Sequence, residues 1–309
     1  MMTSHSFSLF PKPPFRLDLT AWVLRRRPEN EIDRWDGEFY RRVLVIGGKP
    51  VQVSLRQKGT VDEPELAVEV TGDGVGAGYE PLVAAAIARM FGIYHDLNEF
   101  YAFATSQPGL SALARTFRGA KPTRYPTLFE SLVNGISCQQ LSLTVGVLLL
   151  SRLARLYGPP LETNKGTFFA FPQPQDLAHA DPEQMRAIGY SYAKADYIIG
   201  LAQLIEDGKI DLAALETLDD QQALAAVCTM RGVGRWTGEY FLLRGLGRTH
   251  IFPGDDVGAR NNLQRFKNIP DKLTYDGVGE VLADWSRFGG LVYFHLLLKG
   301  LLESGQLNV

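Results

Sequence analysis

The sequence predicts an α+β fold, in which an N-terminal mixed domain of antiparallel strands and helices precedes an all-α domain. Two observations lead to this prediction. Apolar and polar residues alternate at several places before residue 72, which is typical of half-buried strands. After about Ser111 the strand signals vanish, and apolar residues recur at helical spacing between capping residues, glycines and prolines. We therefore expect residues 1–112 and 113–309 to form the two domains.

Within the N-terminal part, valines alternate with other residues on both sides of Gly47-Gly48, which predicts a β-hairpin. The alternation over residues 66–70 predicts a further strand. Pro81 suits the first turn of an Ala-rich helix. Residues 1–14 are rich in Ser and Pro and are expected to be poorly ordered.

Helical patterns fill the rest of the chain. Thr127 can cap the first of them, with Glu130 closing a capping box. Gln139-Gln140 interrupts the apolar periodicity, and a second helix then continues to Tyr157, before Gly and Pro residues. The remaining helical patterns cover residues 182–188, 194–205, 220–228, 237–246, 257–266, 276–288 and 291–302.

Composition limits the class of protein. The chain has 309 residues, of which 45% are hydrophobic and 21% charged, as in ordinary soluble globular proteins. Its formal net charge of −2 means that a polyanion must be bound by a local patch. Cys138 and Cys228 are expected to be buried free thiols in a reducing compartment, and two cysteines cannot form a four-cysteine cluster. No spacing of His and Cys suggests a metal site, so no cofactor is expected.

The N-terminus lacks the pattern of a signal peptide, and the chain has no run of ~18 apolar residues. We therefore expect a protein that is neither secreted nor inserted in a membrane. It would lie in the cytoplasm, associated with the nucleoid, or in a nucleus.

The stretch from Met230 to Arg260 is the most informative part of the sequence. Gly232-Val233-Gly234 makes a tight turn between two helical patterns, which predicts a helix-hairpin-helix. Bare N–H groups of such a turn, together with the next helix N-terminus, bind phosphate. The predicted contacts to a nucleic-acid backbone are made by Gly232, Gly234, Arg235 and Thr237.

An acidic pair, Asp255-Asp256, follows the second helix of this hairpin. A plain clamp has no use for carboxylates near phosphates, so the pair indicates chemistry on the nucleic acid. Either acid could also be a helix N-cap, which is a common use of Asp. A second basic stretch, residues 111–126, carries Arg115, Arg118, Lys121 and Arg124 and is either a solvated linker face or a contact to backbone phosphates.

MRGVGRWTGEYFLLRGLGR followed by FPGDD resembles the helix-hairpin-helix and the Gly/Pro-rich loop of the DNA glycosylase superfamily. Three more segments, FESLVNGISCQQLS, RAIGYSYAKADYIIGLA and WSRFGGLVYFHLL, agree with it in order, so that the resemblance covers roughly residues 110–305. The chain looks most like the 3-methyladenine DNA glycosylase II branch. That resemblance implies a monomeric enzyme without a cofactor, which flips damaged bases out of double-stranded DNA, excises alkylated purines and so initiates base excision repair.

The resemblance places the catalytic carboxylate at Asp256. A carboxylate below the sugar stabilises the positive charge that develops when an N-glycosidic bond breaks, and it can orient the attacking water. A following helix N-terminus would favour the ionised acid. Asp255 is interpreted as a helper or a solvated acid. Relatives that also cut the strand carry a nucleophilic Lys where this chain has Trp236, which implies a monofunctional enzyme that uses water.

The base pocket implied by the resemblance contains aromatic residues. Trp236 and Tyr240 lie four residues apart on one helical face and can attract a cationic alkylpurine. Phe288 matches a second pocket aromatic, and Val257 stands where a relative has an aromatic residue. Each of these aromatics could instead be part of the core.

Gln140 matches the side chain that fills the gap left by a flipped base. It could alternatively be a hydrogen-bonded turn residue. Two other functions remain open at this point: a non-catalytic helix-hairpin-helix DNA-binding protein, and a glycosylase for oxidised or deaminated bases.

Overall fold

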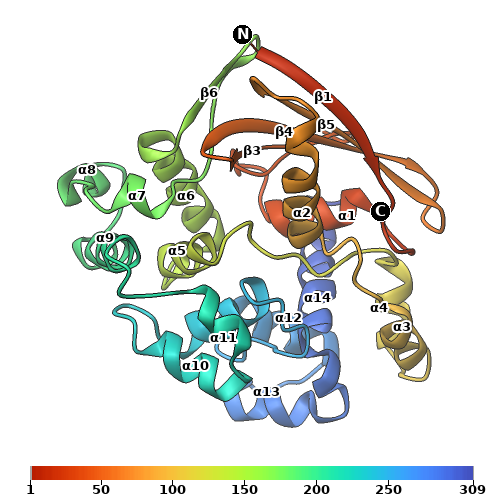
Figure 1. The fold of residues 1–309 in the computed structure, drawn as a ribbon. Coiled ribbons are helices and arrows are strands. Elements are labelled where there is room, and N and C mark those ends of the chain that lie inside the picture. The colour runs from red at the N-terminus through yellow and green to blue at the C-terminus, as the bar shows by residue number, and fades with distance from the viewer. Residues whose placement is uncertain (1, 309) are drawn as a thin grey trace.

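A five-stranded antiparallel sheet forms most of the N-terminal part of the computed structural model, which describes residues 2–308 (Figure 1). The strands are β1 (Met2–Leu9), β2 (Arg34–Trp35), β3 (Tyr40–Ile46), β4 (Lys49–Gly59) and β5 (Pro64–Asp73). Their spatial order is β1-β5-β4-β3-β2, so that β1 and β2 lie at the two edges. Helices α1 (Leu17–Arg25) and α2 (Glu80–Phe91) share a hydrophobic core with the sheet.

The predicted hairpin at Gly47-Gly48 is confirmed. Both glycines have positive φ, 59° and 79°, and Ile46 pairs directly with Lys49 across the turn. For residues 2–14 the expectation of poor order is wrong, because residues 2–9 form the edge strand β1, while residue 1 lies outside the described residues. All eight of its residues pair with β5, and Phe7 and Leu9 pack against the sheet core. The Ser-rich composition therefore does not indicate this strand, which is ordered by its pairing with β5.

The C-terminal part is an assembly of helices, which confirms the α+β class (Figure 1). Its α-helices are α3 (Asn98–Thr105), α4 (Leu110–Thr116), α5 (Leu128–Cys138), α6 (Leu143–Tyr157), α7 (Pro174–Leu177), α8 (Pro182–Ala187), α9 (Tyr192–Glu206), α10 (Asp220–Cys228), α11 (Arg235–Arg244), α12 (Val257–Lys267), α13 (Tyr275–Val281) and α14 (Gly289–Glu303). Short 3₁₀ helices are η1 (Ala77–Tyr79), η2 (Ala213–Thr217) and η3 (Ala283–Phe288). The prediction that no strands follow Ser111 is wrong in one place, where β6 (Pro160–Thr163) and β7 (Gly166–Phe169) form a small hairpin. Leu161 of this hairpin packs against Val43 of the large sheet.

Thr127 caps α5 as predicted, since its Oγ1 accepts the N–H of Glu130 at 3.0 Å. The Glu130 carboxylate does not close a capping box. It bonds instead to the buried guanidinium of Arg42 in β3, at 2.5 and 2.6 Å, and Arg42 also binds Asp33 at 2.8 Å. These buried charges tie the sheet to the helix that carries part of the site.

Two hydrophobic cores fill the helical part, and helix α11 belongs to both. Tyr240 and Leu243 face one core with α12 and α14, whereas Phe241 and Leu242 face the other with α5, α6 and α9. Every residue from 237 to 244 is buried. The body of α11 is therefore packed between the two cores.

The first part of the chain does not end sharply at residue 112, since this position falls inside α4. Leu110 and Leu113 of that helix pack in the same core as α14, and so does Leu19 of α1. Helix α1 itself contacts α14. Residues from the N-terminal part and from the C-terminal helices thus pack in one hydrophobic core, so the two parts of the chain are in contact with each other.

Three of the four basic residues between 111 and 126 make intramolecular contacts. Arg118 pairs with Asp62 at 2.6 Å. Lys121 Nζ donates to the carbonyl of His95 at 2.7 Å, and burial lowers the pKa of Lys121 to about 8. Arg124 donates to the carbonyl of Gly245 at 2.9 Å. These contacts favour a structural role for the stretch over a phosphate-binding one.

Candidate active site between the hairpin and helix α12

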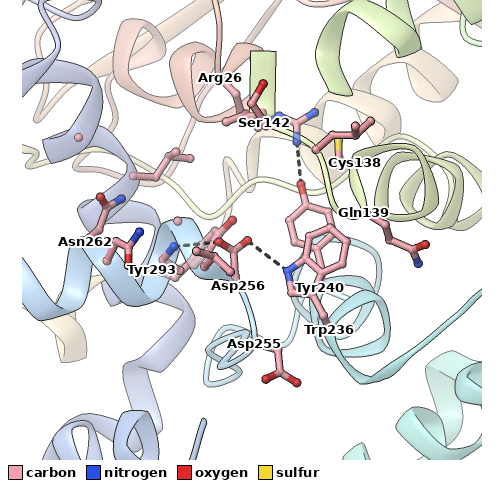
Figure 2. A pocket seen from close by; sticks show the side chains of 18 of the residues that line it. Arg26, Cys138, Gln139, Ser142, Trp236, Tyr240, Asp255, Asp256, Asn262 and Tyr293 are labelled. Carbon is pink, nitrogen blue, oxygen red and sulfur yellow. Dashed lines mark hydrogen bonds between the residues drawn. The ribbon is translucent and has the colours of Figure 1, made fainter. Parts of the chain in front are cut away.

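A cavity of about 960 Å³ lies where five segments of the chain meet (Figure 2). Its walls come from the end of α1, the turn between α5 and α6, the start of α11, the start of α12, and one face of α14. The volume falls at the upper end of the range usual for ligand pockets. The cavity therefore brings together residues that lie far apart in the sequence.

The hairpin between α10 and α11 borders this cavity. Gly232 has φ +85°, and a Cβ there would lie 2.2 Å from the Tyr197 ring. Gly234 caps α11 with φ −97°, and a Cβ there would meet nothing within 4 Å. The positive φ of this turn therefore lies at Gly232 and not at Gly234. Gly234 leaves the helix start open to an approaching group, where the first N–H groups have no intrahelical partner.

Arg235 and Thr237 are less free than predicted. The Arg235 guanidinium binds Asp255 at 2.7 Å and lies over the Tyr275 ring at 3.6 Å. The Thr237 side chain is buried, and its Oγ1 accepts a hydrogen bond from Gln139 at 2.8 Å. Thr237 therefore holds the neighbouring turn inside the protein, and only its backbone N–H remains for a phosphate.

Gln140 lies at the tip between α5 and α6, on the rim of the cavity. Its backbone is left-handed, with φ 55°, and the residue is exposed. The tip is fastened from two sides. Gln139 Nε2 donates to the carbonyl of Gly232 at 2.7 Å, and Lys194 Nζ donates to the carbonyls of Ser137 and Gln139 at 2.9 and 2.6 Å. A fixed backbone thus presents Gln140 beside the hairpin.

Asp256 combines the two roles considered for it. It caps α12, since its Oδ1 accepts the N–H of Ala259 at 2.8 Å. Its Oδ2 accepts the indole N–H of Trp236 at 3.3 Å and lines the cavity (Figure 2). Burial raises the pKa of Asp256 above its ordinary value, and the hydrogen bonds from Ala259 and Trp236 offset only part of that rise.

Asp255 has a different environment from that of its neighbour. Its carboxylate binds Arg235 at 2.7 Å, and Arg260 lies 4.0 Å from its other oxygen. Two guanidinium groups therefore surround it, whereas Asp256 forms no ion pair within 4.0 Å among residues 2–308.

Trp236 and Tyr240 form one aromatic wall. Their rings stack with centroids 5.8 Å apart and an interplanar angle of 22°. The Tyr240 hydroxyl shares a hydrogen bond of 2.8 Å with Tyr125. Val257, at the start of α12, is 58% exposed and leaves this side of the cavity open.

Phe288 does not line the cavity. It ends η3 and is buried against Phe100 and Phe103, with ring centroids 5.6 and 5.1 Å away. The residues of this region that reach the cavity come one to four turns later, on one face of α14 and at the residue that follows the helix. They are Tyr293, Leu297, Gly300, Leu301 and Ser304.

Sequence reasoning missed Tyr293 and Arg26. The spacing of Tyr293, Leu297 and Leu301 by four residues is a signal that could have identified the wall formed by α14. Arg26 is the middle residue of three consecutive arginines, and no spacing distinguishes it from its neighbours.

The family comparison defines the class of protein. The model described as "HhH-GPD superfamily base excision DNA repair protein" matches residues 133–287, about half of the chain. That range contains the hairpin, Gln140, Trp236 and Asp256. The chain therefore belongs to the HhH-GPD superfamily of base excision DNA repair proteins, as the resemblance implied.

Individual relatives extend the similarity to nearly the whole chain. The DNA-3-methyladenine glycosylase of Bacillus subtilis is 29% identical over 91% of this chain and 93% of its own. The DNA-3-methyladenine glycosylase 2 of Escherichia coli is 29% identical over 85% of this chain and 88% of its own. The solved structure of the 3-methyladenine DNA glycosylase from Archaeoglobus fulgidus matches with a TM-score of 0.82 at 24% identity, covering 94% and 97% of the two chains.

Some other solved structures with this fold contain DNA. Across residues 2–308, none of the helices is both long enough and apolar enough to cross a membrane.

Proposed function

We propose that this protein is a monofunctional DNA glycosylase that excises alkylated purines of the 3-methyladenine type from double-stranded DNA. The names of its relatives support this substrate class. The activity initiates base excision repair, which places the protein with the genome, in a nucleoid or a nucleus. One chain supplies every group used below, which supports action as a monomer.

Binding begins at the hairpin. Phosphates of the damaged strand approach Gly234 and the free N–H groups at the start of α11, where the helix dipole favours negative charge. The damaged nucleotide leaves the stack and enters the cavity, and Gln140 fills the gap from its fixed position on the rim. The base then lies against the wall of Trp236 and Tyr240, whose π faces attract a cationic purine.

Asp256 acts on the sugar of the flipped nucleotide. As the C1′–N bond breaks, the bonding electrons stay with the base and positive charge develops on the deoxyribose, which the carboxylate stabilises. Water adds to C1′ and gives up a proton to Asp256 or to solvent. Trp236 stands where a lysine would be needed for a Schiff base, so the strand is left uncut at this step.

The observation that carries the proposal is the hydrogen bond between Trp236 and Asp256, which joins an unpaired carboxylate to the aromatic wall. A non-catalytic DNA clamp has no use for such a carboxylate beside bound phosphates. The test is single-turnover release of free bases from alkylated duplex DNA, followed by chromatography. We expect release of 3-methyladenine by the wild type and its near loss in Asp256→Asn, with Asp255→Asn as the matched control. Tight DNA binding without base release by the wild type would support the clamp instead.

A further inference from the structure

We propose that Glu239 is a positioning residue for the acid of this site. Its buried carboxylate holds the backbone of the loop that leads into helix α12, so that Asp256 keeps the place from which it acts on the sugar. This inference rests on the proposed function, the excision of bases from DNA. It adds to that function a residue that works through Asp256 and touches no substrate itself.

Glu239 is an acid inside the protein. It lies in helix α11, three residues after Trp236, and is 6% exposed. It does not line the cavity. Its Oε2 accepts the backbone N–H of Gly254 at 3.0 Å, and its Oε1 accepts the hydroxyl of Tyr275 at 2.6 Å. A carboxylate is costly to bury, and both oxygens of this one are bound, one of them by the backbone of the loop before Asp256.

The bond to Gly254 differs from two further bonds that α11 makes to the same loop. Those two run from Arg235 and Trp236 to the side chains of the acidic pair, at 2.7 and 3.3 Å. Side chains rotate about their own bonds, so such contacts leave freedom in the backbone that carries them. The bond from the Gly254 N–H fixes the backbone itself, two residues before Asp256.

Gly254 is also confined by its surroundings. A Cβ at this position would lie 2.9 Å from two atoms of the Tyr275 ring, so the backbone passes directly against that ring. The N–H of Asp256 donates to the carbonyl of Pro253 at 3.0 Å and closes a turn that contains Gly254. Glu239 and Tyr275 together thus hold the middle of the turn that ends at Asp256.

The place of Asp256 matters because its charge must face the developing cation on the sugar. Stabilisation of this kind depends on preorganised groups, and a displacement of about 1 Å can cost about a hundredfold in rate. Without the Glu239 carboxylate, the buried N–H of Gly254 would lack a partner, and movement of the loop toward a new partner would displace Asp256. Glu239 is therefore expected to affect bond breaking more than DNA binding, which begins at the hairpin.

The experiment measures two quantities for each variant: the single-turnover rate of 3-methyladenine release at saturating enzyme, and the affinity for an abasic-site duplex. Glu239→Met fills the space of the side chain but accepts no hydrogen bond from Gly254. It should slow release about tenfold to a hundredfold and leave the affinity near that of the wild type. Glu239→Gln should stay within about threefold of the wild-type rate, because its amide oxygen can accept the Gly254 N–H and its nitrogen can donate to the Tyr275 hydroxyl.

Leu153→Ala is the matched control for lost stability. Leu153 is buried in the core of α5, α6 and α9 and does not line the cavity. This substitution should lower the melting temperature without slowing release at a temperature at which the variants are folded. If Leu153→Ala slows release as much as Glu239→Met does, the effect is one of general stability, and the inference is overturned.

Other outcomes would also contradict the inference. If folded Glu239→Met releases base at the wild-type rate while Asp256→Asn does not, the inference fails and the proposed function stands. The same conclusion follows if Glu239→Gln is as slow as Glu239→Met, or if DNA affinity falls as much as release. If Glu239→Met does not fold, Gly254→Ala disturbs the same bond from the loop, and wild-type release by that variant would overturn the inference. Release of no base by the wild type would overturn both the inference and the proposed function.

Discussion

The indole N–H of Trp236 donates to Asp256 Oδ2 at 3.3 Å, so the aromatic wall of the cavity and its unpaired carboxylate form one unit. Trp236 lies in the first turn of α11, the second hairpin helix, and Asp256 is the N-cap of α12, the helix after it. One bond therefore links the phosphate-binding element to the acid. It also favours the ionised carboxylate, because it lowers the pKa of Asp256 against the larger effect of burial.

Two substitutions of Trp236 distinguish the effect of its N–H donor from the effect of its aromatic face. Trp236→Phe keeps a ring but removes the N–H donor, so the pKa of Asp256 should rise further. The ionised form is lost as pH falls through that pKa, so the acidic limit of base release should move to higher pH. Trp236→Ala also removes the cation–π face and should slow 3-methyladenine release ~3–30-fold at neutral pH, corresponding to ~0.5–2 kcal/mol. Single-turnover rates across pH measure both effects. If Trp236→Phe leaves the pH dependence of base release unchanged, the indole N–H does not affect the pKa of Asp256.

The two glycines of the hairpin should respond differently to alanine. Gly234→Ala meets no protein atom within 4 Å, so the melting temperature should stay near that of the wild type. Its methyl group would occupy the approach to the helix start and weaken binding to an abasic-site duplex. Gly232→Ala needs φ +85° and places a Cβ 2.2 Å from Tyr197, so it should lower the melting temperature. If folded Gly234→Ala binds DNA with the wild-type affinity, the hairpin is not part of the DNA-binding interface.

Gln140 should matter only when a duplex must be opened. Gln140→Ala should reduce excision from double-stranded DNA more than from single strands, because only the duplex leaves a gap to fill. Gln139→Ala is a useful comparison, since Gln139 fastens the tip to Gly232 and Thr237. It should also reduce duplex excision, but with a loss of thermal stability that Gln140→Ala does not share. Rates that fall equally on both substrates in Gln140→Ala would assign this side chain another role.

The elements that could be predicted from sequence are those defined by local rules. The helix start at Asp256 and the helical spacing of Trp236 and Tyr240 followed from local patterns, whereas their roles in the site were implied by the resemblance to the glycosylase superfamily. The hairpin at Gly47-Gly48 is equally local, because positive φ at both residues suits glycine. These features need no knowledge of what packs against them.

Other features depend on contacts between distant segments. Strand β1 is ordered by pairing with β5, more than fifty residues later. Phe288 and Tyr293 are both aromatic and close in sequence, yet only the packing of α3 against η3 makes the first a core residue. Arg26 is selected from three arginines by Tyr240 and Asn134, which lie in two other helices. No pattern within α1 contains that information.

Asp256→Asn is expected to uncouple stability from activity. Burial raises the folded-state pKa of Asp256, so the folded protein holds the proton more tightly than the unfolded chain. The stability that this group contributes is present below its ordinary pKa and is lost as pH rises through the raised value. At neutral pH the ionised carboxylate is therefore a cost that Asn removes, while Asn caps α12 equally well. The melting temperature should be equal to or above that of the wild type at neutral pH, and that advantage should shrink in acid.

Base release by Asp256→Asn should nevertheless fall by about a hundredfold or more, as for other groups directed at developing charge. Binding to lesion DNA should hold or tighten, because the carboxylate repels phosphates in the ground state. Asp255→Asn loses a solvent-screened pair with Arg235 and should change release only mildly. Wild-type release should itself decline as pH falls through the raised pKa of Asp256. Single-turnover kinetics and melting curves, measured on the same variants, test these expectations. If folded Asp256→Asn releases base at the wild-type rate, the carboxylate serves only as a helix cap.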